Sequence, residues 1–182
     1  MDYPNIVLLS GTGRNVGKTT FVCSLLKHFT DLRMVTVKVS PHWHRTVYGE
    51  VLLFEDMRLL LTRETSNDSN KDTARMLRCG AAQVYYLQHT DEDAMMQAFN
   101  YLVKTSQEDA PMIIESALLA KYVRPALHLR ITRSDTPPSD KAVPDVPFDK
   151  LVTFDGTQFD MGPDELGWNT KNNSWFLSET RG

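Results

Sequence analysis

Residues 10–20 have the types and the spacing that bind phosphate, because they read Ser-Gly-Thr-Gly-Arg-Asn-Val-Gly-Lys-Thr-Thr. They follow the apolar run 6–9 and precede an amphipathic helical pattern, which predicts a turn from a buried strand into a helix. Such a turn leaves backbone N–H groups without intrachain partners, and the helix dipole adds positive charge there. Gly17 allows close approach of the main chain, Lys18 can reach the β and γ phosphates, and Thr19 can place a hydroxyl on Mg²⁺.

The spacing of this loop departs from the usual pattern G-x-x-x-x-G-K-[ST]. The position five before Gly17 is Thr12, and the glycines Gly11 and Gly13 lie one residue to either side. A glycine-rich turn that binds nothing is the alternative, but Gly-Lys-Thr-Thr after a strand is a specific combination. The candidate residues for holding a nucleotide, GTP or ATP, are Gly13, Arg14, Asn15, Val16, Gly17, Lys18, Thr19 and Thr20.

The form Gly-Thr-x-x-x-Val-Gly-Lys-Thr resembles the variant P-loops of the dethiobiotin synthetase and cobyrinic acid diamide synthase families. More broadly, it resembles small P-loop proteins that include the molybdopterin-guanine dinucleotide biosynthesis protein B family. The resemblance implies an α/β protein that binds a nucleoside triphosphate, with a homodimer as one assembly to test. Some relatives carry a signature lysine near the start of the loop that acts within a dimer; here only Arg14 offers a comparable charge.

A lysine interrupts the second apolar strand pattern, 34–39, close to its end. Ligands bind at the carboxyl ends of strands in open α/β sheets, and Lys38 would be costly there unless an anion meets it or it reaches water. The resemblance to dethiobiotin synthetase implies a lysine that faces phosphate or substrate. Next come His42 and His44, which we expect to be solvated or to face substrate, because Pro41 favours a loop and no third metal ligand is evident.

Residues 71–82 predict a short helix with Gly80 at the C′ position. They resemble a segment of the protein B family that runs lysine, aspartate, serine or threonine, then arginine, then alanine-glycine-alanine. The residues Asp72, Thr73 and Arg75 match it, whereas Cys79 stands where the family usually has alanine. This resemblance makes Asp72 a candidate for binding Mg²⁺, directly or through water. Capping of the helix is the alternative role.

A carboxylate ends the buried strand predicted over 111–117. Glu115 can hold Mg²⁺ through water or orient an attacking water. An ion pair with a base such as Lys38 is the alternative, and both roles place Glu115 in the site. The resembled families commonly continue with glycine, so Ser116 is a departure. The candidate catalytic residues are Lys18, Lys38 and Glu115, and the candidate metal ligands are Thr19, Asp72 and Glu115.

A candidate base-recognition motif lies at the end of the strand predicted over 126–132. The tetrad Thr-Arg-Ser-Asp at 132–135 resembles the base-recognition motif [N/T]-K-x-D of GTP-binding P-loop proteins, with arginine in place of lysine. By this resemblance Arg133 and Asp135 contact the base, and Asp135 accepts from guanine N1 and N2. An ordinary turn before the prolines that follow is the alternative.

The remaining pattern positions these residues in a single domain over 1–182, a three-layer P-loop-like α/β fold with a mostly parallel sheet. The other predicted elements are helix 20–29, a hairpin or helix within 47–64 with the hairpin favoured, a polar loop 64–70 that is mobile or ordered by ligand, strand 83–88, helix 91–105 capped by Thr90, an irregular linker 135–147, and a closing pair of strands at 151–155 and 175–177.

Composition excludes several classes. The 182 residues, 41% hydrophobic and 24% charged, are ordinary for a globular domain, and a net charge of −3 gives no general attraction to nucleic acid. Neither a leader nor an apolar run of roughly 20 residues is evident, so we expect no membrane span and a cytoplasmic protein. Cys23 and Cys79 have no metal or redox spacing, and we expect them to pack as small apolar residues.

The residues favour a Mg²⁺-dependent protein that binds a nucleoside triphosphate, and the resemblance to the protein B family implies a GTP-binding accessory protein of molybdopterin-guanine dinucleotide biosynthesis, with a small-molecule or protein partner. Any hydrolysis would rely on positioning and charge stabilisation. One alternative is an ATP-dependent ligase or small-molecule kinase of dethiobiotin synthetase type. Another is a non-catalytic nucleotide-sensing dimer that acts with a partner protein.

Overall fold

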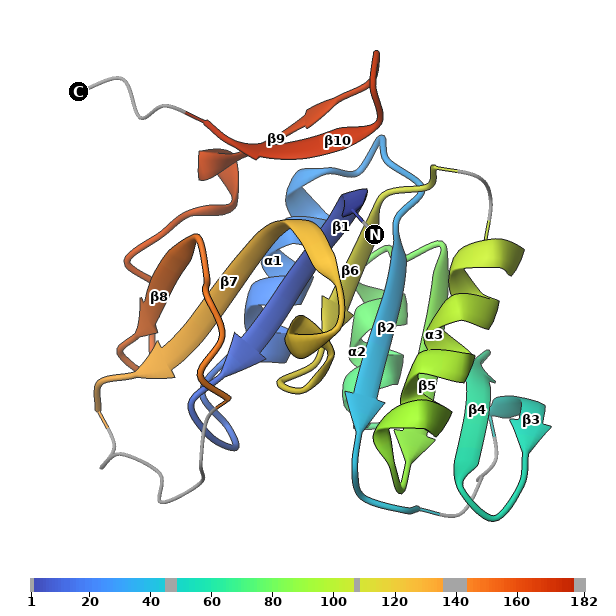
Figure 1. The fold of residues 1–182 in the computed structure, drawn as a ribbon. Coiled ribbons are helices and arrows are strands. Elements are labelled where there is room, and N and C mark those ends of the chain that lie inside the picture. Colours follow the sequence, from blue (N-terminus) through green and yellow to red (C-terminus); the bar gives the residue numbers. More distant parts are fainter. Residues whose placement is uncertain (1, 45–48, 107–108, 136–143, 179–182) are drawn as a thin grey trace.

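An eight-stranded sheet forms the middle of the molecule (Figure 1). The structure is a computed structural model that describes residues 2–44, 49–106, 109–135 and 144–178. Its elements in chain order are β1 (Asp2–Gly11), α1 (Lys18–His28), β2 (Val35–Ser40), β3 (Glu50–Glu55), β4 (Leu59–Glu64), α2 (Asp72–Arg78), β5 (Gln83–His89), α3 (Glu92–Thr105), β6 (Met112–Glu115), the 3₁₀ helix η1 (Leu119–Lys121), β7 (Arg124–Arg133), β8 (Lys150–Phe154), the 3₁₀ helix η2 (Pro163–Glu165), β9 (Leu166–Asn169) and β10 (Ser174–Leu177).

The strand order across the sheet is β3-β4-β5-β2-β6-β1-β7-β8. All neighbours from β5 to β8 pair in parallel, whereas β4 is antiparallel to both β5 and β3. The hairpin favoured for 47–64 is therefore present as β3 and β4. The parallel strands end at one edge of the sheet, the lower edge in Figure 1, where the loop after β1 also lies. The predicted α/β class with a mostly parallel sheet is confirmed.

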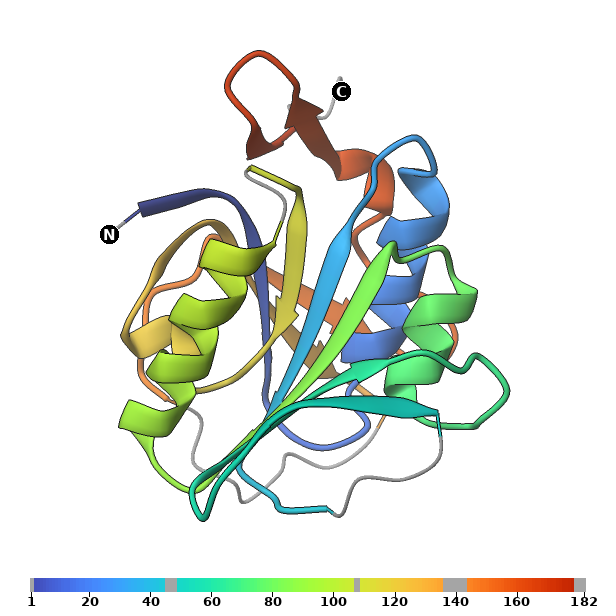
Figure 2. The same cartoon turned by 90° about the vertical axis from the view of Figure 1, so that its right-hand side faces the viewer.

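Alternate side chains of β1 divide the core into two halves. Val7 and Leu9 pack with α1 and α2 on one face, and Ile6 and Leu8 pack with α3 on the other. Figure 2 shows α1 and α2 together on one side of the sheet and α3 on the opposite side. The result is a three-layer arrangement in which both faces of the sheet are covered. Among the described residues, no helix combines the length and the apolar character needed to cross a membrane.

The predicted closing pair of strands is wrong. Strand β8 pairs in parallel with β7 and extends the main sheet, so Val152 becomes fully buried. The later segment forms β10, which pairs with β9 in a separate two-stranded sheet. There the rings of Trp168 and Trp175 contact each other, and Trp175 Nε1 donates to the Asn5 carbonyl oxygen at 3.0 Å. Each segment thus has a partner that alternation alone does not reveal.

The cap of α3 also differs from the prediction. The carboxylate of Asp91 accepts a hydrogen bond from Ala94 N–H at 2.9 Å, so Asp91 caps the helix. Thr90 instead extends the antiparallel pairing of β4 with β5, because its N–H donates to the Arg58 carbonyl oxygen at 3.0 Å. Residues 47–48 of the predicted hairpin and 136–143 of the predicted linker lie outside the described residues.

Candidate nucleotide-binding site

Residues 12–17 connect β1 to α1 in a left-handed turn. Asn15 has φ of 57° and Gly17 has φ of 100°, a conformation that glycine adopts without steric cost. Gly17 is the N-cap of α1, and no side chain caps the helix. The first helical bond is from Phe21 N–H to the Gly17 carbonyl oxygen, at 2.9 Å. By helix geometry, the amides of the first turn have no intrahelical acceptor, so an anion can cap this end.

The side chain of Lys18 folds back over the loop, and its Nζ donates to the Gly13 carbonyl oxygen at 3.1 Å. Space for this comes from Gly11, where a Cβ would lie 2.8 Å from Val16 Cγ2 and 2.9 Å from Lys18 Nζ. The glycine that stands out of register in the sequence, Gly11, therefore makes room for the Lys18 side chain. The ordinary P-loop spacing does not reveal this role.

Lys38 and Glu115 are register partners on the neighbouring strands β2 and β6. Lys38 Nζ lies 3.7 Å from Glu115 Oε2 and donates a hydrogen bond to Asp72 Oδ2 at the start of α2. Glu115 is only 2% exposed, whereas the Asp72 side chain is 38% exposed. The fold thus brings together three charged residues that are distant in sequence. Both roles considered for Glu115 remain open, because the ion pair lies in the candidate site.

The surroundings shift the pKa of each of these groups. Burial lowers the pKa of Lys38, but the Glu115 and Asp72 carboxylates outweigh it, so the net pKa is raised. Burial raises the pKa of Asp72, but the hydrogen bond and charge of Lys38 outweigh it, and the net pKa is lowered. For Glu115, burial outweighs the attraction of Lys38 and Lys18, so its pKa is raised. The site contains a cation, a stable anion and a carboxyl group that ionises more easily when further positive charge arrives.

The oxygen atoms of the three candidate Mg²⁺ ligands, Thr19, Asp72 and Glu115, lie near one another. The Thr19 hydroxyl lowers the pKa of both Asp72 and Glu115, which places it close to the two carboxyl groups. Glu115 Oε1 is buried and has no hydrogen-bond partner among the described residues. The described residues contain no group of three or more histidines, cysteines or acidic residues arranged so that they could hold a metal ion by themselves. One hydroxyl and two carboxylates fit Mg²⁺, which takes few protein ligands and completes its shell with phosphate and water.

Two cavities flank these charged residues, and Lys18, Lys38 and Glu115 border both. The first has a volume of about 220 Å³ and is lined by Asn15, Val16, Gly17, Lys18, Thr19, Thr20, Lys38, Asp72, Arg75, Glu115, Arg133 and Phe154. The second has a volume of about 250 Å³ and is lined by Gly11, Thr12, Gly13, Arg14, Lys18, Lys38, Val39, Pro41, His42, His89, Glu115, Ser116, Ala117, Leu118 and Pro144. The first cavity, at the start of α1, is the candidate phosphate cavity.

The tetrad at 132–135 contacts the P-loop. Thr12 Oγ1 donates to Thr132 Oγ1 at 3.2 Å, and Arg133 Nη1 donates to the Asn15 carbonyl oxygen at 3.0 Å. The Arg133 guanidinium also binds both carboxylate oxygens of Asp135, with Nη2 2.8 Å from Oδ2. Arg133 lines the phosphate cavity, and its carboxylate partner lies beside it on the exposed side. Base recognition by Asp135 stays a prediction, and it requires Asp135 to share its carboxylate with Arg133.

Some residues of the site were not among the candidate residues from the sequence. Arg75 lines the candidate phosphate cavity, and its Nη2 lies 3.4 Å from Thr20 Oγ1. The ring of Phe154 lies against Gly17, where a Cβ would be 3.0 Å from Phe154 Cδ1. The sequence offered one indication of Arg75, because this residue matches the arginine of the resembled protein B segment at 71–82. No sequence signal indicated Phe154, because its contact depends on how β8 joins the sheet.

The two histidines after β2 differ in their roles. His42 Nε2 lies 3.1 Å from Arg14 Nη2, so His42 contacts the P-loop and borders the second cavity. His44 is held through its backbone, because its carbonyl oxygen accepts from Gln88 Nε2 at 3.1 Å and its N–H donates to Gln88 Oε1. Both histidines are exposed, as expected, and a role in facing substrate stays a prediction.

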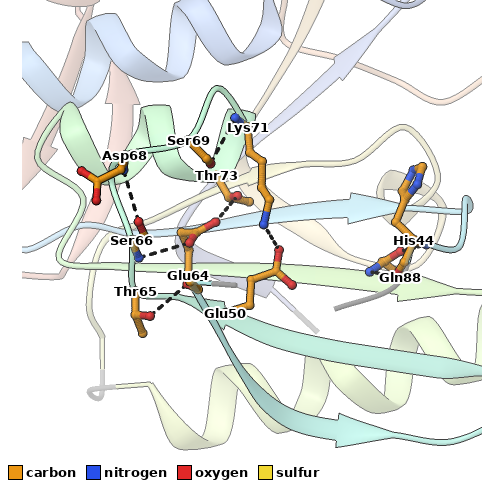
Figure 3. Close-up of polar contacts among 11 residues, drawn as sticks. His44, Glu50, Glu64, Thr65, Ser66, Asp68, Ser69, Lys71, Thr73 and Gln88 are labelled. Atoms are coloured by element: carbon orange, nitrogen blue, oxygen red, sulfur yellow. Dashed lines mark hydrogen bonds and ion pairs between the residues drawn. The ribbon is translucent and has the colours of Figure 1, made fainter. Parts of the chain in front are cut away.

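The polar loop before α2 is held by contacts within the chain, although a mobile or ligand-ordered loop was expected. Glu64 Oε2 accepts from Thr73 Oγ1 at 2.7 Å, and Glu64 Oε1 accepts from Ser66 N–H at 3.2 Å (Figure 3). A separate ion pair joins Lys71 Nζ to Glu50 Oε1 at 2.5 Å. The buried Glu64 at the end of β4 thus anchors the approach to α2, which carries Asp72.

We compared the chain with protein-family models, with curated proteins and with solved structures, and none of the three comparisons found a match.

Proposed function

We propose that the protein binds a nucleoside triphosphate together with Mg²⁺, prefers GTP, and hydrolyses it at most weakly. The observation that carries this proposal is the convergence of Lys18, Lys38 and Glu115 beside the uncapped start of α1. Lys38 and Glu115 come from adjacent parallel strands, and Lys18 comes from the helix that follows a third. This convergence supplies the positive charge and the carboxylate that a triphosphate with its metal requires.

Each residue has a defined part in binding. The amides of the first turn of α1 and the Lys18 ammonium group bind the phosphates, and Lys38 exchanges part of its contact with Asp72 for the terminal phosphate. Residues Thr19, Asp72 and Glu115 would hold Mg²⁺. The metal, when bound, would neutralise negative charge on the phosphates. Positive charge beside Glu115 favours its ionised form, so binding and ionisation strengthen each other.

The preference for GTP rests on the tetrad at 132–135. Arg133 links the P-loop at Asn15 to the Asp135 carboxylate, so a base bound beside Arg133 would lie within reach of an acceptor for guanine N1 and N2. With the family resemblance, this supports an accessory role in molybdopterin-guanine dinucleotide biosynthesis, with a small-molecule or protein partner. Cytoplasmic location belongs to the same proposal, and both cysteines are free thiols, as expected in a reducing compartment.

The second cavity supports the alternative of an ATP-dependent ligase or small-molecule kinase. It lies across Lys38 and Glu115 from the phosphate cavity, and Arg14 and His42 border it. A small acceptor molecule bound there would face the terminal phosphate. Incubation with labelled ATP and candidate acids, followed by mass spectrometry, would distinguish this activity from GTP binding alone.

A homodimer could form through the β3 edge of the sheet, both for the accessory protein and for a nucleotide-sensing protein. β3 is the outermost strand, and its side chains Val51, Leu52, Leu53 and Phe54 are 36–47% exposed. The adjacent Met57 is 92% exposed. An exposed apolar edge strand is a template for pairing with a second copy. Sedimentation velocity of the protein and of a Leu52→Lys variant tests this: a dimer that becomes monomeric is expected, and a monomer in both contradicts it.

A thermal-shift screen tests the nucleotide proposal. We expect GTP with Mg²⁺ at about 100 times its Kd to raise the melting temperature by roughly 5–10 °C, with smaller shifts for ATP or without the metal. A matched exposed variant, Lys104→Ala on α3, should respond like the unmodified protein. Absence of any shift with every nucleotide contradicts the proposal, and a shift with ATP alone contradicts its GTP preference.

A further inference from the structure

Helices α1 and α2 lie side by side on one face of the sheet (Figure 2). At one end of the contact, Arg75 Nη2 lies 3.4 Å from Thr20 Oγ1. At the other end, a Cβ on Gly80 would lie 3.9 Å from the Leu26 carbonyl oxygen. Cys23 on α1 and Cys79 at the end of α2 lie between these two contacts. The helix pair therefore positions the two cysteines opposite each other.

The two thiols also open into the same cavity. This cavity has a volume of about 360 Å³ and is lined by Thr20, Cys23, Ser24, Lys27, Arg75, Arg78 and Cys79. Cys23 is 7% exposed and Cys79 is half-buried, and both are free thiols. Three of the lining residues, Lys27, Arg75 and Arg78, are cationic, so they attract an anionic oxidant to the cavity. A small anionic oxidant could reach Cys79 first.

We propose that Cys23 and Cys79 are a reversible redox site, which a small-molecule disulfide such as oxidised glutathione converts into an intramolecular disulfide. This proposal does not rest on nucleotide binding. It assigns a role to a cysteine pair that has no redox spacing in the sequence, since the two residues are 56 positions apart and meet only through the packing of α1 on α2.

The reaction proceeds in two exchanges. Cys79 loses its thiol proton, and its sulfur attacks one sulfur of the small disulfide; the Cys79–sulfur bond forms, and one small thiolate leaves and takes up the proton. Cys23 then loses its proton, and its sulfur attacks the Cys79 sulfur of the mixed disulfide. The Cys23–Cys79 bond forms and the second small thiol leaves. The protein loses two electrons and two protons, and the oxidant becomes two thiols.

The second exchange should be the slower one at neutral pH. Burial, together with the neighbouring Cys79 thiol, raises the pKa of Cys23 to about 12. Cys23 therefore resolves the mixed disulfide slowly at neutral pH and faster as the pH rises. The resulting bond would link α1, which begins at Lys18 of the P-loop, to α2, which begins at Asp72.

Peptide mapping of the full chain after treatment with oxidised glutathione tests the proposal. We expect the intact mass to fall by two hydrogen atoms, a linked peptide pair that contains Cys23 and Cys79, and full reversal by dithiothreitol. The Cys23→Ala variant should retain one glutathione on Cys79, and Cys79→Ala should form no internal link. We also expect oxidation to raise the melting temperature of the unmodified protein by several degrees, because the link constrains the unfolded chain.

Three outcomes would overturn the proposal: unmodified thiols after an exposed reference thiol has reacted fully, separate glutathione adducts on both cysteines without a linked peptide, or a disulfide between two chains on a non-reducing gel. Mapping of the unmodified protein decides between them even if an alanine variant fails to fold.

Discussion

Lys38 and Glu115 are register partners on adjacent parallel strands, and their charged groups lie 3.7 Å apart at the edge of the sheet next to the P-loop. Because Glu115 is almost fully buried, its charge depends on this lysine for compensation. Asp72 joins them from α2. The ion pair therefore combines a stabilising contact with a place in the candidate nucleotide-binding site.

Loss of the lysine charge should destabilise the protein. For Lys38→Met we expect the free energy of unfolding to fall by roughly 3 kcal/mol, since the buried Glu115 would lose its main counter-charge and keep only the weaker attraction of Lys18. Urea unfolding measures this change. The double variant Lys38→Met/Glu115→Gln should recover most of the loss, whereas strictly additive losses would show that the two side chains are not coupled.

The Lys38–Asp72 contact should make stability depend on acid. The folded pKa of Asp72 lies below its ordinary value of 3.8, so this group stabilises the fold above that pH and its contribution is lost as the pH falls through the folded value. Because the pair is partly exposed, we expect a contribution of about 1 kcal/mol. Thermal unfolding between about pH 6 and about pH 3 should show the difference between the protein and Asp72→Asn shrink in acid. A difference that grows in acid would contradict the sign.

Two glycines should separate binding from stability. Gly11→Ala places a methyl group against Val16 and Lys18 Nζ, so we expect nucleotide affinity to fall at least tenfold. Gly80→Ala affects a residue with φ of 107° in the cap of α2 and should cost about 1 kcal/mol of stability with unchanged affinity. Calorimetric titration and urea unfolding of both variants check this. Equal nucleotide affinity in both variants would rule out the space argument for Gly11.

Base preference should depend on Asp135. We expect Asp135→Ala to reduce the ratio of GTP to ATP affinity by about tenfold, because a charge-assisted hydrogen bond contributes roughly 1.5 kcal/mol or more. Ser134→Ala, at the neighbouring exposed position, is the control. Competition binding with both nucleotides measures the ratio. An unchanged ratio in Asp135→Ala would remove the basis for guanine recognition by this tetrad.

The sequence predicted most of the central fold because most of the parallel strands contain a run of apolar residues that the sheet buries. The alternation of apolar and polar residues in the C-terminal segments did not show which strands they pair with. Strand β8 pairs with β7 and β10 pairs with β9, and these pairings depend on how the whole chain folds. For the same reason the contact of Phe154 with Gly17 was not expected. The cap of α3 was placed one residue early, at Thr90, because Thr90 and Asp91 are both suitable N-cap types.

The candidate site was predictable where a residue's position along one strand or loop determines its location. Glu115 ends β6 and Lys38 lies two residues before the end of β2, and parallel strands end at the same edge of the sheet. The roles of Gly11, Arg133 and the cysteine pair depend on contacts between distant segments. Those contacts follow from tertiary packing, which local spacing does not encode.

The central claim is that the P-loop binds a nucleoside triphosphate through Lys18. Isothermal titration of the full chain with GTP and Mg²⁺, beside Lys18→Ala and the exposed control Lys104→Ala, tests it most directly. We expect saturable binding to the protein and to Lys104→Ala, and affinity at least about 100-fold weaker for Lys18→Ala, a loss of roughly 2.7 kcal/mol. Unchanged affinity in folded Lys18→Ala, or no binding of any nucleotide to the unmodified protein, would contradict the claim.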